Sequence, residues 1–564
     1  MLTMKHQLVI LLVCKLAHHI AGEPATSSNY WRLVNEQILD EKLSTFADLI
    51  QPAKNVILFI GDGMGVTVET AARIYVGQKM KLHSDQTPLA WQQFPWVGTQ
   101  KTYDVDRHTT DSASSATAYL TGIKSHYYTL GVGSGVPWKD CAASNREPHP
   151  SSIASWALEQ GKVTGFVTTT RVTHATPGAL YAHVADREWE AHAPSPCTDI
   201  AQQLVRNQPG NQFMVVMGGG RRSFLSPTNS MSRDNKRQDG RDLVREWQRM
   251  HPEGQLLYTS EQLNNVDTSS DRPILGLFEH NHFEYQLLAD KWANTTQPTL
   301  AEMTRVAIEK LHNNDAGNGY FLLVEAGRID HALHDGYGKL ALDETHELHK
   351  AVELALKLTD RSETLIVVTA DHSHPFNLIG YPHRNVSILG TFDPSEDFEL
   401  PNSPLTTILT FANGPQALNR PETGPFLRNL TNVDTEADLF QQPTLVPAKY
   451  DTHGGEDVVV YAIGPGAALF TGNYENTFIA RAMAYVLCVG FDRTACNQHE
   501  HHGARKSADN DQSNTALFVF LIVLCVLCLL GLVVAIALLV MLNRKLNLRV
   551  NINNQGSEMS TVRM

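Results

Sequence analysis

The sequence carries little positive charge for its length. Its 564 residues include 46 Lys and Arg against 59 Asp and Glu, which gives a formal net charge of −13. Proteins that bind nucleic acids or anionic surfaces concentrate Lys and Arg where they bind. We therefore expect no nucleic acid as a dedicated partner. The sequence also shows no internal repeat, and its length allows several domains or one large α/β body.

Charge is absent from residues 516–542. A helix needs about 20 apolar residues to cross a bilayer, so this run is long enough. Arg544, Lys545 and Arg549 follow it, and the positive-inside rule then places the tail, residues 543–564, in the cytoplasm. A glycolipid-anchor signal would end in its hydrophobic stretch. Because a polar tail follows here, we expect a single-pass helix in the cell membrane rather than a glycolipid anchor.

The N-terminus predicts secretion. Residues 8–14 are apolar and small residues follow near Ala21, so residues 1–22 are expected to be a cleaved signal peptide. Residues 23–496 then form the extracellular domain, and the polar, histidine-rich residues 497–515 form a stalk. Three sequons are compatible with a glycosylated domain: Asn294, Asn385 and Asn429.

Cysteine is scarce, with seven residues in the chain. Cys14 leaves with the signal peptide, and Cys525 and Cys528 lie in the uncharged C-terminal run. An even number remains in an oxidising compartment, namely Cys141, Cys197, Cys488 and Cys496. Three pairings are possible, and we favour Cys141–Cys197 with Cys488–Cys496 because these bridges close the shortest loops.

The apolar runs in the body of the chain lack the alternation that marks a half-exposed sheet. They lie at residues 55–60, 163–169, 213–217, 321–324, 365–368 and 458–461. Helical stretches, such as residues 300–312 and 343–358, separate them. This pattern predicts an α/β fold with a large, mostly parallel sheet flanked by helices on both faces. Residues 31–51 predict an arm or a surface helix.

Chemically active side chains stand at or just after the ends of these runs: Asp62, His174, Glu325, Asp371 and His372. Ligand sites in such sheets gather at the carboxyl ends of the strands. We therefore expect these side chains to lie together. Residues 375–450 are rich in Pro, Asn and Thr with short β-prone pieces, which predicts an insertion built on the edge of the sheet.

Ser112 is a candidate nucleophile. It lies between Asp111 and a run of Ala, Ser and Thr, so a helix is expected to begin at or just after it. A serine there faces free backbone N–H groups and the positive end of the helix dipole, which suits an anionic substrate such as phosphate. The alternative interpretation is that Asp111 and Ser112 only cap an ordinary helix.

Metal-ligand patterns occur twice on predicted elements. If a helix begins after Arg328, Asp330 and His334 lie at i and i+4 on one face and can hold one cation, although an ion pair on the helix surface is the alternative. Asp371, His372 and His374 follow a buried strand, where unpaired polar groups are costly. Metal ligation is the economical explanation for that group.

Two further candidates lie in glycine-rich turns. Asp62 stands between Gly61 and Gly63, directly after the first apolar run, and its alternative is a plain Asp-Gly turn. His453 precedes two glycines, which permit close approach to a site, but a histidine in a surface turn is the alternative.

Six separated motifs together resemble those of the animal alkaline phosphatases, in the family's order. They are IGDGMG at 60–65, TDSA at 110–113, TTTRVTHAT at 168–176, EAGRIDH at 325–331, TADHSH at 369–374 and THGGED at 452–457. The resemblance covers most of the chain, from about Trp31 to Cys496. Agreement at six motifs by chance is negligible.

The resemblance implies two zinc ions and one magnesium ion. It assigns the first zinc to Asp330, His334 and His453, the second to Asp62, Asp371, His372 and the Ser112 oxygen, and magnesium to Asp62, Thr176 and Glu325 with His174 close by. Arg187 matches the family's arginine that clamps phosphate oxygens. The family also pairs cysteines at positions that match both bridges favoured above, and it implies a homodimer in which residues 375–450 match the crown region.

The sequence departs from the family in three places. Phe278 and Glu279 match part of a calcium site that animal members often carry, but its other acids do not align. Leu333 replaces a histidine that is common in vertebrate members. The C-terminus is typical of a membrane span, whereas family members usually end in a glycolipid anchor.

The resemblance implies an extracellular phosphomonoesterase that hydrolyses small phosphate monoesters through a phosphoserine intermediate on Ser112. Zinc beside Ser112 would depress the pKa of its hydroxyl, and metals with a bidentate guanidinium would spread the charge of an in-line displacement. One alternative is a phosphodiesterase or sulfatase of the same superfamily. Another is a non-catalytic surface binding protein, which the complete ligand set disfavours.

Overall fold

The computed structural model describes residues 27–46, 49–82, 86–234, 236–292, 295–395, 405–416 and 430–490, with Leu538 and Met541. The predicted signal peptide, stalk and cytoplasmic tail, together with Asn294, Asn429 and Cys496, lie outside these residues, as does nearly all of the predicted span. Among the described residues, no helix is long and apolar enough to cross a membrane. The chain divides into two units, Met1–Arg493 and Thr494–Met564, and the strands and helices named below all lie in the first.

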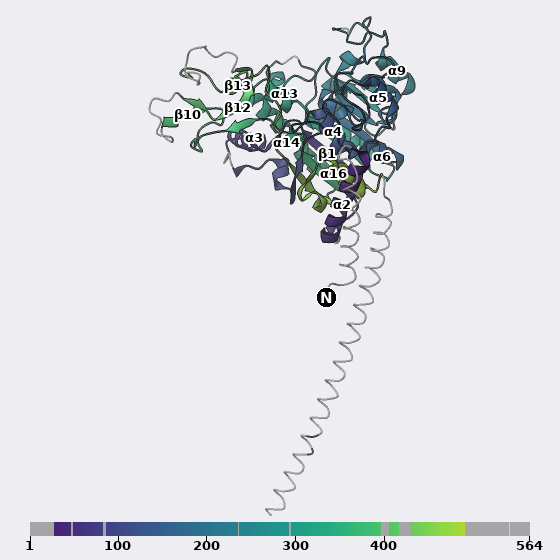
Figure 1. Cartoon of the computed structure of the whole chain (residues 1–564), viewed down its shortest axis with the longest axis horizontal. Coiled ribbons are helices and arrows are strands. Elements are labelled where there is room, and N and C mark those ends of the chain that lie inside the picture. The colour runs from purple at the N-terminus through teal and green to yellow at the C-terminus, as the bar shows by residue number, and fades with distance from the viewer. Residues whose placement is uncertain are drawn as a thin grey trace, which may run out of the picture. The chain divides into compact units, whose positions relative to one another are not determined.

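A ten-stranded sheet organises this unit, with the strand order β15-β2-β14-β8-β1-β7-β3-β4-β6-β5. Figure 1 shows the strand β1 of this sheet among surrounding helices. The strands are β1 (Asn55–Gly61), β2 (Trp96–Lys101), β3 (Val163–Arg171), β4 (Val215–Gly219), β5 (Gln255–Leu257), β6 (Ile274–Leu277), β7 (Tyr320–Ala326), β8 (Thr364–Thr369), β14 (Val458–Ile463) and β15 (Gly472–Glu475). Among the described strands of this sheet, only the two pairs that β14 makes, with β2 and β8, are antiparallel. The predicted mostly parallel sheet is confirmed, as a mixed sheet in which parallel pairs predominate.

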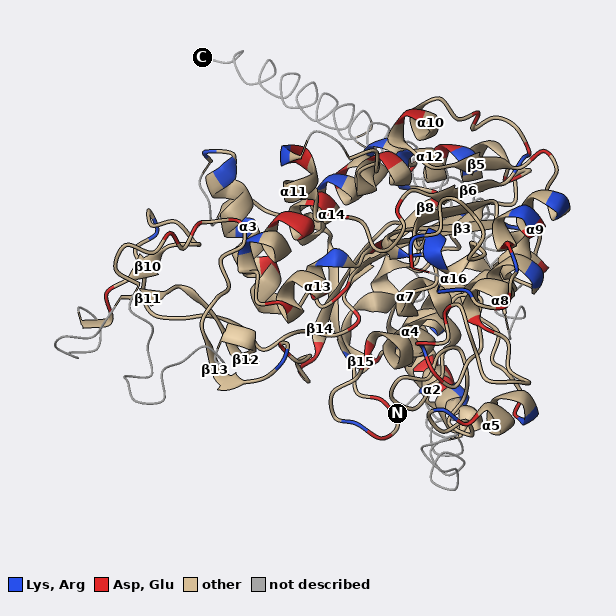
Figure 2. Ribbon diagram, turned by 90° about the horizontal axis from the view of Figure 1, so that it is seen from above, with Lys and Arg blue, Asp and Glu red and all other residues tan. Residues whose placement is uncertain are grey.

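Helices cover both faces of the sheet. They are α2 (Ser28–Phe46), α3 (Val66–Lys79), α4 (Ser112–Thr121), α5 (Cys141–Arg146), α6 (Ile153–Glu159), α7 (Ala175–Gly178), α8 (Ile200–Arg206), α9 (Leu243–Met250), α10 (Ser260–Asn264), α11 (Gln286–Lys291), α12 (Leu300–Asn313), α13 (Arg328–His334), α14 (Gly338–Leu358) and α16 (Thr477–Leu487). Figure 2 shows α10 and α12 on one side of the strands and α4, α8 and α16 on the other. The central strands β1, β7 and β8 are buried because both faces are covered, which explains their continuous apolar sequence.

The core and the helix ends follow from the sequence. Every residue of β1, β7 and β8 is buried. α12 begins with a capping box in which Thr299 and Glu302 exchange side-chain and backbone hydrogen bonds. α2 is not a free arm, because it buries Trp31 and Leu39 and because Asn35 donates to the carbonyls of Gly122 and Thr477.

The segment between β8 and β14 contains two small sheets of its own. β9 (Phe376–Leu378), β12 (Leu409–Gly414) and β13 (Thr444–Pro447) form one, and β10 (Thr391–Phe392) pairs with β11 (Thr406–Thr407) in the other. Since β8 and β14 are antiparallel neighbours inside the large sheet, this insertion leaves the carboxyl end of β8 and returns at the amino end of β14. The sequence predicted an insertion built on the edge of the sheet, and its assignment to a crown stays a prediction.

Two surface features of the sequence can be located. A disulfide joins Cys141 to Cys197, with the Cα atoms 5.8 Å apart. Cys488 is disulfide-bonded as well, and its proposed partner Cys496 is outside the described residues. Asn385 is exposed, as a glycosylation site must be, and its modification stays a prediction.

Candidate active site

Strand register brings the candidate acids to one end of the sheet. Ile60 of β1 is opposite Glu325 of β7 on one side and Thr369 of β8 on the other. Asp62 and Asp371 each follow their strand by two residues or fewer, so both carboxylates lie beside Glu325 at the carboxyl edge. All three are fully buried. The sequence-based expectation that the topology gathers them is confirmed.

Ser112 is the first residue of α4. Asp111 caps the helix, since its carboxylate accepts hydrogen bonds from the N–H groups of Ala113 and Ser114. Ser112 is 2% exposed, and its Oγ lies 3.3 Å from Nε2 of His372. The capping and nucleophile interpretations are therefore compatible, because the cap belongs to Asp111 while the Ser112 hydroxyl points at the imidazole.

Four side chains form the first cluster, around Nε2 of His372. This nitrogen lies 3.6 Å from Oδ1 of Asp62, 3.2 Å from Oδ2 of Asp371 and 3.3 Å from Oγ of Ser112. His372 Nδ1 is 3.2 Å from the carbonyl of Ser373, which can only accept. The proton therefore sits on Nδ1, and Nε2 presents a lone pair to the carboxylates.

The carboxylates of this cluster lack partners within the described part of the chain. Neither oxygen of Asp62 has a hydrogen bond there, and neither does Oδ2 of Asp371. Burial, and then the neighbouring carboxylates, raise the pKa of Asp62, and burial raises the pKa of Asp371. Buried oxygens and a lone pair that face one another need a cation between them.

The second cluster contains Asp330, His334 and His453. α13 places Asp330 and His334 one turn apart, as the sequence predicted. His334 donates through Nδ1 to the carbonyl of Asp451, and His453 donates through Nδ1 to the carbonyl of Thr110 at 2.8 Å. Both Nε2 atoms therefore carry lone pairs, yet they lie only 3.1 Å apart. Oδ1 of Asp330 is 3.4 Å from Nε2 of His334 and 3.5 Å from Nε2 of His453.

These separations fit zinc. Ligand atoms about 2.0–2.1 Å from a tetrahedral zinc stand roughly 3.3–3.4 Å from one another. The distances of 3.1–3.6 Å between ligand atoms within both clusters bracket that value. Each cluster also has the mixed nitrogen and oxygen ligands that suit zinc.

A third group shares Asp62 with the first. One atom each from Asp62, His174 and Glu325 lies within 4.8 Å of the others. Oε1 of Glu325 and Oγ1 of Thr176 are buried without hydrogen-bond partners among the described residues. Burial raises the pKa of Glu325 to about 7. Asp62, Thr176 and Glu325 offer oxygen only, which suits magnesium.

Arg187 lies beside the helix end that carries Ser112. Its Nη1 donates to Oδ2 of Asp111 at 2.8 Å, and its Nη2 donates to Nε2 of His174 at 3.0 Å. Although burial opposes its charge, Asp111 raises the pKa of Arg187, so the guanidinium stays cationic. A fixed, partly buried guanidinium next to a helix N-terminus suits the binding of a phosphoryl group.

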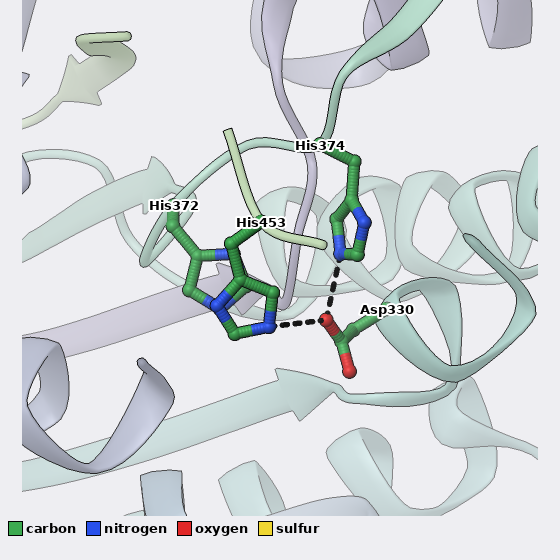
Figure 3. A group of neighbouring side chains, drawn as sticks. All are labelled: Asp330, His372, His374 and His453. Carbon is green, nitrogen blue, oxygen red and sulfur yellow. Dashed lines mark hydrogen bonds and ion pairs between the residues drawn. The ribbon is translucent and has the colours of Figure 1, made fainter. Parts of the chain in front are cut away.

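His374 does not join Asp371 and His372 as a free imidazole. Figure 3 shows it pointing at Asp330, with His372 and His453 stacked beside it. Its Nε2 is 2.8 Å from Oδ1 of Asp330, and its Nδ1 is 2.7 Å from Oδ2 of Asp451. Although burial opposes protonation, these two carboxylates raise the pKa of His374 to about 9. It therefore orients Asp330 rather than offering a lone pair.

The family resemblance named the members of these three groups, but neither it nor the sequence pattern indicated the residues that orient them. Asp111 appeared only as a cap, and Asp451 gave no signal, since it lies in an irregular segment. Asp451 orients both His334 and His374. Glu279, half of the partial calcium match, belongs to none of the described groups that could hold a metal ion.

The comparisons with known proteins agree with this geometry. The family model for alkaline phosphatase matches residues 53–489. The membrane-bound alkaline phosphatase of Bombyx mori is 41% identical over 460 residues, which cover 79% of this chain and 82% of that protein. The tissue-nonspecific alkaline phosphatase of Gallus gallus is 40% identical over 512 residues, covering 88% and 96%.

Solved structures show the same fold. The alkaline phosphatase of Thermus thermophilus matches with a TM-score of 0.57 and 22% identity, covering 79% of this chain and 94% of that one. The alkaline phosphatase of the Antarctic bacterium TAB5 matches with a TM-score of 0.54 and 21% identity, covering 78% and 100%.

A helix-covered sheet with carboxylates and imidazoles around one serine at its carboxyl edge defines an α/β enzyme of the metal-dependent hydrolase class. Within that class, the chain belongs to the alkaline phosphatase family. It is a phosphatase, and its family acts on phosphate monoesters with the help of metal ions.

Proposed function

We propose that the protein is an extracellular, membrane-anchored phosphomonoesterase that passes the phosphoryl group of its substrate to Ser112 and then to water. One observation carries the proposal. The Ser112 hydroxyl lies 3.3 Å from Nε2 of His372, at the N-terminus of α4, among carboxylate oxygens that have no other partner in the described part of the chain.

The three groups of side chains would hold two zinc ions and one magnesium ion. Asp330, His334 and His453 form the first zinc site; Asp62, Asp371, His372 and Ser112 form the second; Asp62, Thr176 and Glu325 form the magnesium site. When bound, such ions act as Lewis acids that lower the pKa of a coordinated hydroxyl and stabilise negative charge in phosphoryl transfer.

The chain's own residues account for the binding and the nucleophile. Hydrogen bonds to Asp111 and His174 hold the guanidinium of Arg187 in place. Its remaining N–H groups can therefore bind two phosphoryl oxygens. The N–H groups of α4 face the same charge. Ser112 Oγ loses its proton and bonds to phosphorus, the ester P–O bond breaks on the opposite side, and the leaving oxygen takes up a proton.

Hydrolysis of the phosphoserine completes the cycle. A water oxygen bonds to phosphorus while the bond to Ser112 Oγ breaks, which releases inorganic phosphate and restores the hydroxyl with a proton. Ser112 is buried, whereas Tyr450, whose ring centroid is 5.5 Å from that of His334, is half exposed. Since little of the leaving group is enclosed, broad specificity for phosphate monoesters is expected.

Ser112→Ala tests the nucleophile. Turnover of an aryl phosphate should fall at least about a thousandfold, since removal of a nucleophile costs this much in comparable enzymes, while zinc and magnesium content stays within one ion of the wild type. Ser125→Ala is the matched control, because Ser125 is equally buried and its Oγ has no hydrogen-bond partner among the described residues. Full turnover in Ser112→Ala would refute the proposal.

Matched substrates separate this function from its relatives. The same aryl group is offered as a phosphate monoester, a methyl phosphate diester and a sulfate. The monoester should be turned over fastest by several orders of magnitude. A preference for the diester or the sulfate would assign the other reaction, and a purified ectodomain without metal or turnover would support a binding protein.

Anchoring and assembly complete the proposal. The uncharged run 516–542 with basic residues after it supports a retained membrane helix, an extracellular ectodomain and a cytoplasmic tail. A homodimer in which residues 375–450 form the crown, as the family resemblance implies, is part of the same proposal. The mass of the mature C-terminal peptide tests the anchor, since a glycolipid signal would have been removed together with residues 543–564.

A further inference from the structure

Helix α4 presents two serines to the segment that carries Asp371 and His372. Ser112 and Ser115 lie at i and i+3, so they share one face of the helix. Ser112 Oγ is 3.3 Å from Nε2 of His372, and Ser115 Oγ is 2.7 Å from the backbone carbonyl oxygen of Asp371. The two serines therefore contact consecutive residues at the end of β8.

The hydrogen bond of Ser115 has a fixed direction. A backbone carbonyl oxygen can only accept, so the Ser115 hydroxyl is the donor. The distance of 2.7 Å is that of a well-formed O–H···O bond. Ser115 is 1% exposed, so solvent does not compete with it for the carbonyl of Asp371.

The other contacts of Asp371 leave one carboxylate oxygen to meet a cation. Its Oδ1 accepts hydrogen bonds from the backbone N–H groups of Gly63 and His372, each at 3.0 Å. Its Oδ2 has no hydrogen-bond partner in the described part of the chain and lies 3.2 Å from Nε2 of His372. These N–H groups fix the rotation of the carboxylate, whereas Ser115 fixes the backbone of Asp371 relative to α4.

The end of β8 is attached to the sheet independently of α4. Nε2 of Gln100, in β2, donates to Oγ1 of Thr369 at 2.9 Å and to the carbonyl of Ala370 at 2.7 Å. Thr369 Oγ1 in turn donates to the carbonyl of Val459, in β14, at 2.7 Å. Gln100 is fully buried. These bonds hold the strand end, and Ser115 then attaches the helix that carries the nucleophile to it.

Ser112 cannot maintain this attachment during the proposed reaction. Its oxygen bonds to phosphorus in one half of the cycle and is released in the other, so its contact with His372 changes at each step. Ser115 takes no part in bond making, and its hydrogen bond to Asp371 can persist throughout. Because a misplacement of about 1 Å can cost about a hundredfold in rate, the position of α4 matters to the chemistry.

We propose that Ser115 is a positioning residue, which holds α4 in register with Asp371 and so keeps the Ser112 oxygen in place within the first cluster of the active site. Ser115 acts through the backbone carbonyl of Asp371, so it supplies neither a ligand atom nor a reacting atom. The proposal rests on the proposed phosphatase function, because Ser112 is the nucleophile in it.

Ser115→Ala tests the proposal in the full-length, metal-loaded protein. The change removes the donor and keeps every side chain that could hold a metal ion. We expect kcat for an aryl phosphate to fall about tenfold, because the Ser112 oxygen is less well placed. The inhibition constant of inorganic phosphate should stay within about twofold, because the clamp Arg187 is unchanged.

Thr121→Val is the matched control. Thr121 is also buried in α4, but its hydroxyl donates at 2.6 Å to the carbonyl of Thr117 in the same helix. Each variant loses one buried hydrogen bond, so the two chelated proteins should lose similar stability. Only Ser115→Ala should lose kcat.

Cobalt in place of zinc gives a readout that does not depend on turnover, since its visible absorption follows the coordination geometry. The spectrum should change in Ser115→Ala and match the wild type in Thr121→Val. An unchanged spectrum in Ser115→Ala would overturn the proposal, as would a kcat equal to that of Thr121→Val.

Two further outcomes are informative. If Ser115→Ala fails to fold while Thr121→Val folds, the role of Ser115 is structural and the proposal is overturned. If the wild type has no turnover, the proposed phosphatase function fails, but the cobalt spectra still show whether Ser115 positions the cluster. The two failures are therefore distinguishable.

Discussion

Arg187 is positioned before any substrate arrives. Its Nη1 donates to Asp111 and its Nη2 donates to His174. The ring centroid of Tyr128 lies 5.5 Å from the guanidinium carbon. Asp111 therefore has two functions, since it caps α4 and also directs the arginine. Because both contacts hold the guanidinium in place, little side-chain entropy remains to be lost when phosphate binds.

Removal of Arg187 should mainly weaken phosphate binding. Hydrogen bonds to charged groups contribute about 1.5–3 kcal/mol, so the inhibition constant of inorganic phosphate should rise roughly 10- to 100-fold in Arg187→Ala. Competitive inhibition of aryl phosphate hydrolysis measures it. Arg206→Ala is the control, because Arg206 is a surface arginine paired with Glu246. An unchanged inhibition constant would contradict the clamp.

The raised pKa of Glu325 lets us predict how the stability of the metal-free protein changes with pH. Its pKa is raised from 4.5 to about 7 by burial. Between about pH 4.5 and pH 7, Glu325 is therefore protonated in the folded state and ionised in the unfolded state. The stability of the folded state consequently falls as the pH rises through this range. The contribution is about 3 kcal/mol. The chelated protein should unfold at a lower temperature at pH 8 than at pH 5, and Glu325→Gln should reduce that difference.

Glu69 provides the control for this pH effect. Burial raises its pKa to about 7 as well, but it bonds Trp91 and Tyr461 away from the site. Glu69→Gln should reduce the pH dependence equally in the chelated and the metal-loaded protein, whereas Glu325→Gln should do so only after chelation. Identical behaviour of the two variants would show that Glu325 does not face a metal.

At the scale of elements, the turn after β1 contacts residues of both predicted zinc sites. Gly63 has φ +72°, and a Cβ there would lie 2.8 Å from Cδ2 of His374 and 3.2 Å from Cα of Asp330. The N–H of Gly63 also donates to Oδ1 of Asp371 at 3.0 Å. The turn thus connects both predicted zinc sites.

Gly63→Ala should weaken zinc binding in addition to lowering stability through backbone strain. Gly317→Ala is the matched control, because Gly317 has φ +86° but no described atom within 4 Å of its would-be Cβ. A left-handed non-glycine residue costs about 1–3 kcal/mol, so both variants should lose stability. Only Gly63→Ala should also lose zinc, as measured by metal analysis of the dialysed protein. Equal zinc content in both would show that the turn does not position the ligands.

The disulfide closes the segment that carries Arg187. Cys141 and Cys197 are 56 residues apart in sequence, and the chain-entropy estimate for such a loop is about 4 kcal/mol. Cys141→Ser combined with Cys197→Ser should lower the unfolding temperature and raise KM for an aryl phosphate, because the loop around Arg187 gains freedom. A change in stability with an unchanged KM would mean that the bridge does not constrain the clamp.

Long strands buried on both faces could be predicted from their apolar runs, whereas the short buried strand β6 was missed and the half-exposed β14 was found. β1, β7 and β8 are continuous apolar runs, so their ends located Asp62, Glu325 and Asp371. β2 escaped detection because its burial alternates and its sequence, WVGTQK, contains no apolar run. The antiparallel direction of β14 was equally hidden, since direction leaves no trace in a short apolar stretch.

Within the site, contacts between residues that are distant in sequence could not be predicted either. His282 and His331 are separated by β7 and α12 in sequence, and no local pattern indicates that they touch. Asp451 acts through its backbone carbonyl on His334, which no residue type reveals. Candidate ligands such as Asp62 and Asp371 could be proposed because they follow well-defined strands, whereas Thr176 was proposed only from the family resemblance.

At the scale of the whole molecule, metal binding and folding should be coupled. The site is lined by buried carboxylates that lack partners among the described residues, so each ion present at about 1,000 times its Kd would add roughly 4 kcal/mol of stability. Chelation should lower the unfolding temperature by roughly ten degrees or more, and zinc with magnesium should restore it. Calorimetry measures this shift, and an unchanged temperature would contradict the assignment of the three groups.

The central claim is that Ser112 carries the phosphoryl group between substrate and water. The most direct measurement is to quench the enzyme in acid during turnover of a phosphate monoester and to map phosphorylated peptides by mass spectrometry. We predict a single substrate-dependent phosphoserine at Ser112, absent from Ser112→Ala. Phosphate on another residue, or an active enzyme with no trapped phosphate, would contradict the account.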